Sequence, residues 1–133
     1  MGTVSVRYIV DDVEAAIDFY RDRLGFEVRF HPAPGFASME RGDLELLLNA
    51  PGAGGAGVAG DGVPEPGGWN RFQIVVEDLK GFVEQLSDAG VKFRGKIAHG
   101  RGGDQILLED PSGNVIELFE PPQGSADPDS SQP

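Results

Sequence analysis

The sequence predicts a mixed α+β fold made of two βαβββ modules in tandem. Residues 5–28 and 71–93 share one pattern, in which a strand, an acidic pair, an amphipathic helix, a glycine and a second strand follow each other. Two further short strand-like segments follow each of these regions. A glycine- and proline-rich stretch over residues 51–68 separates the two halves. These three observations together predict the fold class.

The first strand of each module alternates in character, which predicts one face against a helix and one open face. In the first module, Val6, Tyr8 and Val10 are suited to packing, so Ser5, Arg7 and Ile9 are predicted to face away from the helix. In the second module, the packing residues are Phe72, Ile74 and Val76, and the open residues are Arg71, Gln73 and Val75.

The helices have recognisable start and stop signals. Asp12 and Asp78 are predicted N-caps, because an aspartate at this position accepts hydrogen bonds from amides of the first turn. Gly25 and Gly90 are predicted stops, because glycine adopts positive φ without a steric penalty. The apolar faces are Val13, Ala16, Ile17 and Tyr20 in the first helix, and Leu79, Phe82, Val83 and Leu86 in the second.

The remaining strands form predicted hairpins. Residues 36–40 and 44–49 surround a turn at 41–43, and residues 105–109 and 115–120 surround the turn sequence DPSGN. We therefore expect one domain over residues 1–120. It consists of module one (3–50), a linker (51–68) and module two (69–120). The polar, proline-rich residues 121–133 are predicted to be a disordered tail.

Composition restricts the classes of partner. The chain of 133 residues has a net charge of −11 and scattered basic residues, so it lacks the positive stripe of a nucleic-acid-binding protein. It has no cysteine, which excludes disulfides, thiolate metal sites and cysteine nucleophiles. The first residues do not resemble a secretion signal, and no apolar run is long enough for a bilayer. A cytoplasmic protein without membrane or nucleic-acid partners is expected.

Three motifs carry a resemblance to a known family. They are VDDVEAAIDFYRDRLGFEV, VEDLKGFVEQLSDAGV and LLEDPSGNVIELFEP. Their order and spacing resemble the vicinal oxygen chelate superfamily, which includes glyoxalase I, bleomycin-resistance proteins and extradiol dioxygenases. The resemblance implies curved mixed sheets around a cup-shaped cavity, often in a homodimer. It also implies that catalytic members hold a divalent metal with four His or Glu side chains.

Matching the four implied metal positions leaves an incomplete ligand set. They fall on Ser5, Arg71, Glu117 and a position near Leu47, with Glu45 two residues earlier on the same strand face. Arginine cannot ligate a cation, because its guanidinium stays protonated and has donors only. No metal, cofactor or catalytic residue is therefore predicted. Whether Glu45 or Leu47 occupies the first-module position stays open.

The implied cavity contains Arg7, Arg71, Gln73 and Glu117. We expect Arg71 to pair with Glu117 at the implied metal position, because a buried guanidinium needs an anionic partner. This pair could contact ligand, or it could only support the fold.

Aromatic and histidine side chains are predicted at the rim of the cavity. Trp69 suits either ligand contact or linker packing, and Phe36 suits either the rim or the core. His31, after a strand over residues 27–30, could reach the rim or be a solvated loop histidine. The same two interpretations apply to His99, which lies in a glycine-rich segment.

The function favoured by these residues is metal-independent binding of a small molecule, an antibiotic or a metabolite, by a homodimer. The alternative is a metal-dependent enzyme of glyoxalase, dioxygenase or thiol-transferase type that recruits Glu45, Glu117 and one histidine. A third interpretation is metal-free acid–base catalysis by Glu117, whose pKa burial would raise and Arg71 would lower. The predicted ligand-binding residues are Ser5, Arg7, His31, Phe36, Trp69, Arg71, Gln73 and Glu117.

Overall fold

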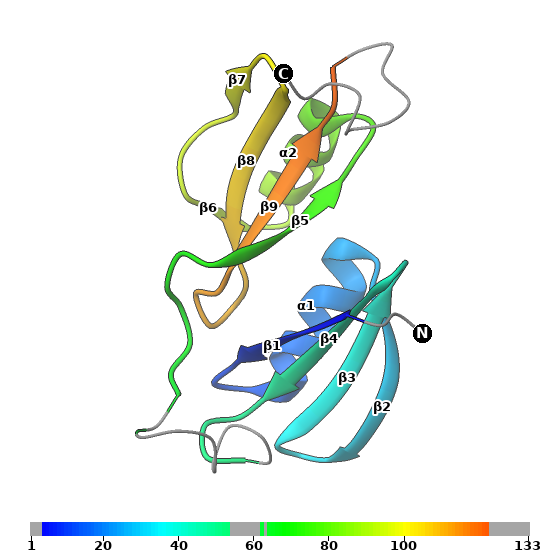
Figure 1. Cartoon of the computed structure of the whole chain (residues 1–133), viewed down its shortest axis with the longest axis vertical. Helices are drawn as coiled ribbons and strands as arrows, with labels where there is room; N and C mark the ends of the chain where they lie inside the picture. Colours follow the sequence, from blue (N-terminus) through cyan, green and yellow to red (C-terminus); the bar gives the residue numbers. More distant parts are fainter. Residues whose placement is uncertain (1–3, 54–61, 63, 123–133) are drawn as a thin grey trace. The chain divides into compact units, whose positions relative to one another are not determined.

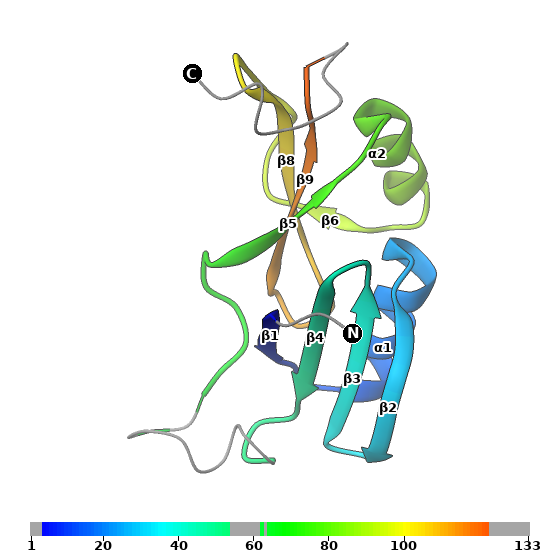
Figure 2. The same ribbon diagram turned by 45° about the vertical axis from the view of Figure 1, so that its right-hand side comes forward.

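The chain folds into two compact units, each with one mixed sheet and one helix (Figures 1 and 2). The structure is a computed structural model that describes residues 4–53, 62 and 64–122. Unit 1 comprises Met1–Trp69 with Asp110–Asn114, and unit 2 comprises Asn70–Glu109 with Val115–Pro133. The predicted α+β class with two βαβββ modules is confirmed. Much of the predicted linker and nearly all of the predicted tail lie outside the described residues.

Unit 1 follows the order βαβββ. Its sheet has the strand order β1-β4-β3-β2, in which β1 and β4 are parallel and the other pairs are antiparallel. The elements are β1 (Val4–Ile9), α1 (Val13–Leu24), β2 (Glu27–Ala33), β3 (Phe36–Arg41) and β4 (Leu44–Asn49).

Local sequence signals account for α1 and its packing. The Asp12 side chain accepts a hydrogen bond from the Ala15 amide at 3.1 Å, and Gly25 ends the helix with φ 75°. The predicted helix face is buried against the sheet, where Tyr20 and Phe26 meet edge to face. Fully buried side chains of this core also include Met39, Leu46 and Leu48.

Unit 2 has the same order with one additional short strand. Its sheet has the order β5-β9-β8-β6, with β5 and β9 parallel and β7 paired to β8. The elements are β5 (Arg71–Val75), α2 (Leu79–Asp88), β6 (Lys92–Phe93), β7 (Ala98–Gly100), β8 (Gly103–Glu109) and β9 (Val115–Glu120).

The predicted signals of α2 are also confirmed. The Asp78 side chain accepts a hydrogen bond from the Gly81 amide at 3.1 Å, and Gly90 follows the helix with φ 82°. Beneath α2, Ile74, Leu108, Ile116 and Leu118 form an apolar layer that is at most 4% exposed. Among the described residues, neither helix is long and apolar enough to span a bilayer.

Two predicted boundaries were wrong. β2 continues to Ala33, so His31 and Pro32 lie in a strand rather than in a loop. Proline is tolerated there because β2 is an edge strand, on which one row of amides needs no partner. His99 likewise lies in a strand, because β7 and β8 form a hairpin around the glycine-rich turn.

The DPSGN turn between β8 and β9 belongs to unit 1, although both strands belong to unit 2. Asp110 is 4% exposed, and its carboxylate accepts hydrogen bonds from the Tyr20 hydroxyl at 2.8 Å and from the amides of Ser112 and Asn114. Burial raises the pKa of Asp110, whereas these hydrogen bonds act to lower it. The Asn114 side chain also donates to the Ile9 carbonyl at 2.8 Å.

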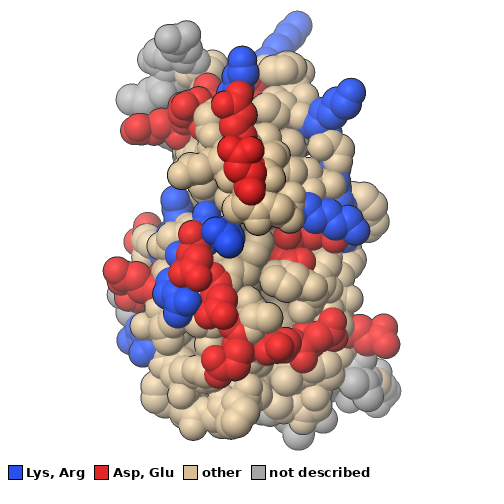
Figure 3. Space-filling model, turned by 180° about the vertical axis from the view of Figure 1, so that it is seen from behind, with Lys and Arg blue, Asp and Glu red and all other residues tan. Residues whose placement is uncertain are grey.

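The charged side chains of the chain are mostly acidic. Figure 3 shows long stretches of red carboxylate side chains, with basic side chains beside or between them. This distribution agrees with the net charge of −11.

Candidate functional site

The open face of the unit 2 sheet carries a cluster of polar side chains from β5 and β9. Along β5, Ile74 is buried against α2, whereas Arg71 and Gln73 point to the opposite, exposed face. The register pairs Gln73 with Glu117 on β9, so these side chains are neighbours on one face. The predicted separation of packing residues from open residues is confirmed for both modules.

Glu117 is held through both of its carboxylate oxygens. Its Oε1 accepts a hydrogen bond from Arg71 Nε at 3.0 Å, and its Oε2 accepts one from Gln73 Nε2 at 2.7 Å. The predicted ion pair of Arg71 and Glu117 is therefore confirmed. The Glu117 side chain is 10% exposed and the Arg71 side chain 31%, so the carboxylate is buried and the guanidinium is not.

A second ion pair lies one row further along the sheet. Arg94 Nε contacts Glu109 Oε2 at 2.6 Å, and Lys92 Nζ lies 3.6 Å from the other oxygen. The hydrogen bond from Arg94 is the main reason why the pKa of Glu109 lies below its ordinary value. The two glutamates of this face are thus both neutralised by basic neighbours.

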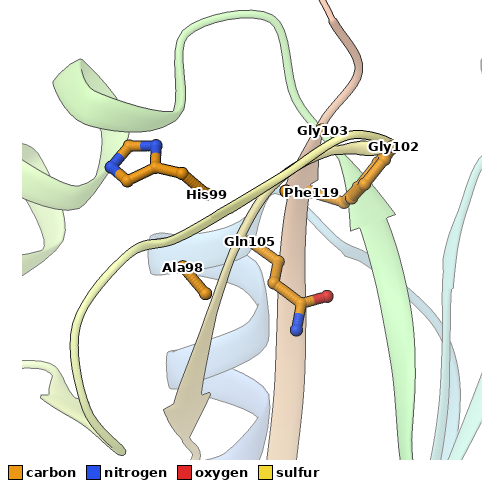
Figure 4. Close-up of a pocket in the computed structure, with 7 residues that line it drawn as sticks. Ala98, His99, Gly102, Gly103, Gln105 and Phe119 are labelled. Atoms are coloured by element: carbon orange, nitrogen blue, oxygen red, sulfur yellow. The ribbon is translucent and has the colours of Figure 1, made fainter.

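A pocket of about 260 Å³ lies at the hairpin of β7 and β8 (Figure 4). Its walls are mostly apolar and include glycine backbone. It is lined by Ala98, His99, Gly100, Gly102, Gly103, Gln105 and Phe119.

The pocket adjoins the Glu117 cluster through the sheet register. Val75, Phe119, Gln105 and Ala98 form one cross-strand row from β5 to β7. Glu117 lies in the next row of the same face, two residues before Phe119 on β9. One open face therefore combines an apolar pocket with a paired carboxylate.

The open face of unit 1 holds a differently built carboxylate site. Glu45 accepts hydrogen bonds from the hydroxyls of Ser5 at 2.7 Å and Ser38 at 2.9 Å, and Arg29 lies 3.4 Å away. These hydrogen bonds, first the one from Ser5, hold the pKa of Glu45 below its ordinary value. On the same face, the Arg7 guanidinium donates to the side-chain oxygen of Asn49.

The register shows which residue of module one corresponds to Glu117. Arg7 lies two residues after Ser5 and pairs with Leu47, as Gln73 lies two residues after Arg71 and pairs with Glu117. Leu47 is therefore the counterpart of Glu117, and Glu45 lies one row earlier, opposite Ser5.

The structure brings together only some of the predicted site residues. Arg71, Gln73 and Glu117 form one cluster in unit 2. In unit 1, Ser5 contacts Glu45, and Arg7 contacts Asn49, which pairs with the half-buried Phe36.

The other two predicted residues lie elsewhere. His31 Nε2 is 3.5 Å from Glu14 Oε1 on α1, so this histidine contacts the helix rather than the Glu45 site. Trp69 is 67% exposed. Roles of all these residues in ligand binding stay predictions.

The donor set does not fit the four-ligand metal site that the resemblance implies. Its positions carry Ser5, Leu47, Arg71 and Glu117, which supply one carboxylate, already engaged by two donors. Metal sites of this kind need several lone pairs converging on one ion. Within the part of the chain that the structure describes, no group of three or more His, Cys, Asp or Glu side chains is placed to hold a metal.

Several site residues were missed at the level of sequence. Ser38, Gln105 and Phe119 are among them, and they contact Glu45 or line the pocket. The two-residue period of the strands could have identified Ser38 from Phe36 and Phe119 from Glu117. Gln105 becomes recognisable only through its pairing with β7, which sequence patterns did not predict.

Solved structures with the same fold include binding proteins and enzymes. A glyoxalase/bleomycin resistance protein/dioxygenase superfamily member from Sphaerobacter thermophilus is 27% identical, with a TM-score of 0.72, and the match covers 87% of this chain and 94% of that one. A lactoylglutathione lyase from Agrobacterium tumefaciens is 21% identical, with a TM-score of 0.70 and coverages of 90% and 92%. The bleomycin-binding protein of Streptomyces verticillus, solved with copper(II)-bleomycin, is 23% identical, with a TM-score of 0.60 and coverages of 90% and 95%.

Sequence comparison identifies the family directly. No curated protein matches the chain significantly. The family model described as Glyoxalase/Bleomycin resistance protein/Dioxygenase superfamily matches residues 2–118, which is nearly the whole described chain. The chain therefore belongs to the glyoxalase/bleomycin resistance protein/dioxygenase superfamily.

Proposed function

We propose that the chain binds a small organic molecule, an antibiotic or a metabolite, without the help of a metal ion. The open face of the unit 2 sheet is the ligand surface in this proposal. On fold alone the chain could equally be an enzyme, because a lyase and an antibiotic-binding protein share its architecture. The choice between them depends on the side chains of the site.

The observation that carries the proposal is the state of Glu117. A carboxylate that ligates a metal must direct a lone pair at the ion, and each Glu117 oxygen already uses one of its two lone pairs for a donor on β5. The Arg71 guanidinium occupies the position of a ligand and supplies positive charge itself. A cation added here would be repelled by Arg71 and would compete with two hydrogen bonds to the same carboxylate.

Binding needs less than catalysis, and the unit 2 face provides what it needs. A binding site requires a concave, largely apolar surface with a few placed polar groups. The pocket at the β7–β8 hairpin and the adjoining Arg71, Gln73 and Glu117 cluster have these properties. The bleomycin-binding neighbour is a precedent for binding on this fold.

A homodimer belongs to the same proposal. Its support is the edge strand β2, in which every residue is exposed, including Val28 at 42% and Phe30 at 57%. Apolar side chains on an unpaired strand edge favour pairing with another chain. Light scattering coupled to size-exclusion chromatography should give the mass of a dimer, and a monomer mass across micromolar concentrations would contradict this part.

The test of the function is a thermal-shift screen in the presence of excess EDTA. The panel contains cationic glycopeptides, aromatic natural products and acidic metabolites, because a ligand of the native state raises Tm by mass action. We expect at least one class to raise Tm by a few degrees, with the same shift with and without EDTA.

Matched variants of β9 connect any hit to the site. Glu117→Gln should weaken the ligand-induced shift, because it removes the charge that orients Arg71. Glu120→Gln makes the same chemical change on the helix side of β9, where Glu120 accepts a hydrogen bond from the Leu79 amide, and should leave the shift unchanged. A shift that EDTA abolishes would contradict metal-independent binding.

A further inference from the structure

We propose that the pocket at the β7–β8 hairpin takes a planar, uncharged aromatic group of the ligand. This inference rests on the proposed binding function and names the chemical class of its ligand.

The shape of the pocket favours a flat group. Gly100, Gly102 and Gly103 form the hairpin end, so part of the wall is bare backbone. The hairpin lies tightly against Phe119, because a Cβ on Gly103 would come within 2.7 Å of the Phe119 ring and closer still to the Glu120 carbonyl oxygen. A ring can lie flat against such backbone and against the phenyl group.

The size of the pocket fits part of a ligand. Sites that enclose a drug-sized molecule have volumes of roughly 300–1,000 Å³. At about 260 Å³ this pocket is smaller, so it suits one ring or two fused rings. The rest of the ligand would then extend over the adjoining row of Gln73 and Glu117.

The chemistry of the wall allows one directed hydrogen bond. Ala98 and Phe119 are apolar, and the Gln105 carboxamide has no hydrogen-bond partner among the described residues. Figure 4 shows Ala98 and Gln105 extending on one side of the hairpin, whereas the His99 ring extends away from them. A carboxamide is both donor and acceptor, so it matches a hydrogen-bonding substituent on the ring.

The charges around the pocket favour an uncharged group. His99, the titratable residue of the wall, lies 3.0 Å from Asp104, and Glu117 in the next row is paired with Arg71. A charged ring would lose hydration on entering this apolar space and would find its possible counterions already paired. A neutral ring loses much less hydration there.

Three probes that share a naphthalene ring and carry a neutral, an anionic or a cationic substituent test this inference on the full chain. They are 2-naphthamide, 2-naphthoate and 2-naphthylmethylammonium, titrated into ¹⁵N-labelled protein and followed by NMR. We expect 2-naphthamide to shift the amide signals of Gly102 and Gly103 and the side-chain signal of Gln105. We expect the two charged probes to bind at least about tenfold more weakly.

A pair of variants in the hairpin turn provides the control. Gly102 has open space around its Cβ position and no positive φ, so Gly102→Leu should fold normally and fill the pocket. It should weaken 2-naphthamide binding by at least about tenfold, as judged from Kd. Arg101→Leu adds the same side chain next to it, at a residue that does not line the pocket, and should change Kd by less than about twofold.

Three results would overturn the inference. They are no binding of 2-naphthamide, equal or tighter binding of a charged probe, and shifts confined to residues outside the pocket. The proposed function would still hold after any of these results if a compound from the thermal-shift screen with EDTA binds at Arg71, Gln73 and Glu117. If no compound raises Tm in that screen but 2-naphthamide binds, the pocket takes an aromatic group and the proposed function is wrong.

Discussion

Unit 1 and unit 2 share one order of strands and helix but use their polar groups differently. Unit 1 buries its strongest polar cluster, formed by Asp110, Tyr20 and Asn114, and holds Glu45 on its open face with two serine hydroxyls. Unit 2 puts an ion pair and a pocket on its open face. The main polar cluster of unit 1 is thus buried and supports the fold. The ion pair and the pocket of unit 2 lie on its open face, where a ligand has access to them.

Repetition of the fold in the two units does not repeat the site. Leu47 stands where Glu117 stands in the second module, and the carboxylate of Glu45 is displaced by one row of the sheet. Each carboxylate accepts one hydrogen bond from a donor in its own row and one from a donor in the next row. Function therefore depends on the side chains and on the additional β7–β8 hairpin, because the two modules otherwise share their order of elements.

The largest effect on stability is expected at the buried cluster of unit 1. Asp110→Ala removes the acceptor of four hydrogen bonds and leaves the Tyr20 hydroxyl and the Asn114 amide buried without it. We expect a loss of about 3 kcal/mol in the free energy of unfolding, measured with urea. Tyr20→Phe removes one of these bonds and should lose about 1 kcal/mol. A loss below about 1 kcal/mol for Asp110→Ala would contradict the role given to this cluster.

A smaller effect should separate the two open faces. Arg71→Ala leaves the Glu117 carboxylate, 10% exposed, without its cation, and should lower the free energy of unfolding by about 2 kcal/mol. Arg7→Ala removes a hydrogen bond to the neutral Asn49 side chain, and about 1 kcal/mol is expected. Ligand affinity is measured on the same proteins. If Arg71→Ala lowers the free energy of unfolding but leaves the ligand affinity unchanged, the ion pair of Arg71 and Glu117 supports the fold only.

The smallest effect concerns pH and the Glu109 pair of unit 2. Because Arg94 lowers the pKa of folded Glu109, the pair stabilises the protein above the ordinary glutamate pKa of about 4.3, and this contribution is lost as the pH falls through the lower folded value. Arg94→Met should therefore be less stable than the wild type at pH 7 by less than about 1 kcal/mol. The difference should shrink in acid. A difference in stability between the two proteins that grows below pH 4 would contradict the lowered pKa of Glu109.

The fold was largely predictable because its signals are local. The capping aspartates, the glycines after the helices and the alternation of the strands each act within a few residues. The pair of Arg71 and Glu117 was also predictable, since strand alternation places both on one face.

The missed features depend on contacts between distant parts of the sequence. Asp110 reads as a turn residue, and only its contact with Tyr20, 90 positions earlier, shows that it is buried. The pocket requires the pairing of β7 with β8 and the close approach of Gly103 to Phe119. No periodicity in a glycine-rich segment indicates such a hairpin.

Whether the chain binds a metal ion can be measured by metal analysis of the purified protein. The protein is prepared without chelator and incubated with Zn²⁺, Ni²⁺ or Mn²⁺ in separate samples. Each sample is desalted, and its metal content is measured by inductively coupled plasma mass spectrometry. Because Arg71 and Gln73 engage both oxygens of Glu117, we predict less than about 0.1 ion per chain for each metal. About one ion per chain, lost in Glu117→Gln, would contradict the account and favour a metal-dependent enzyme.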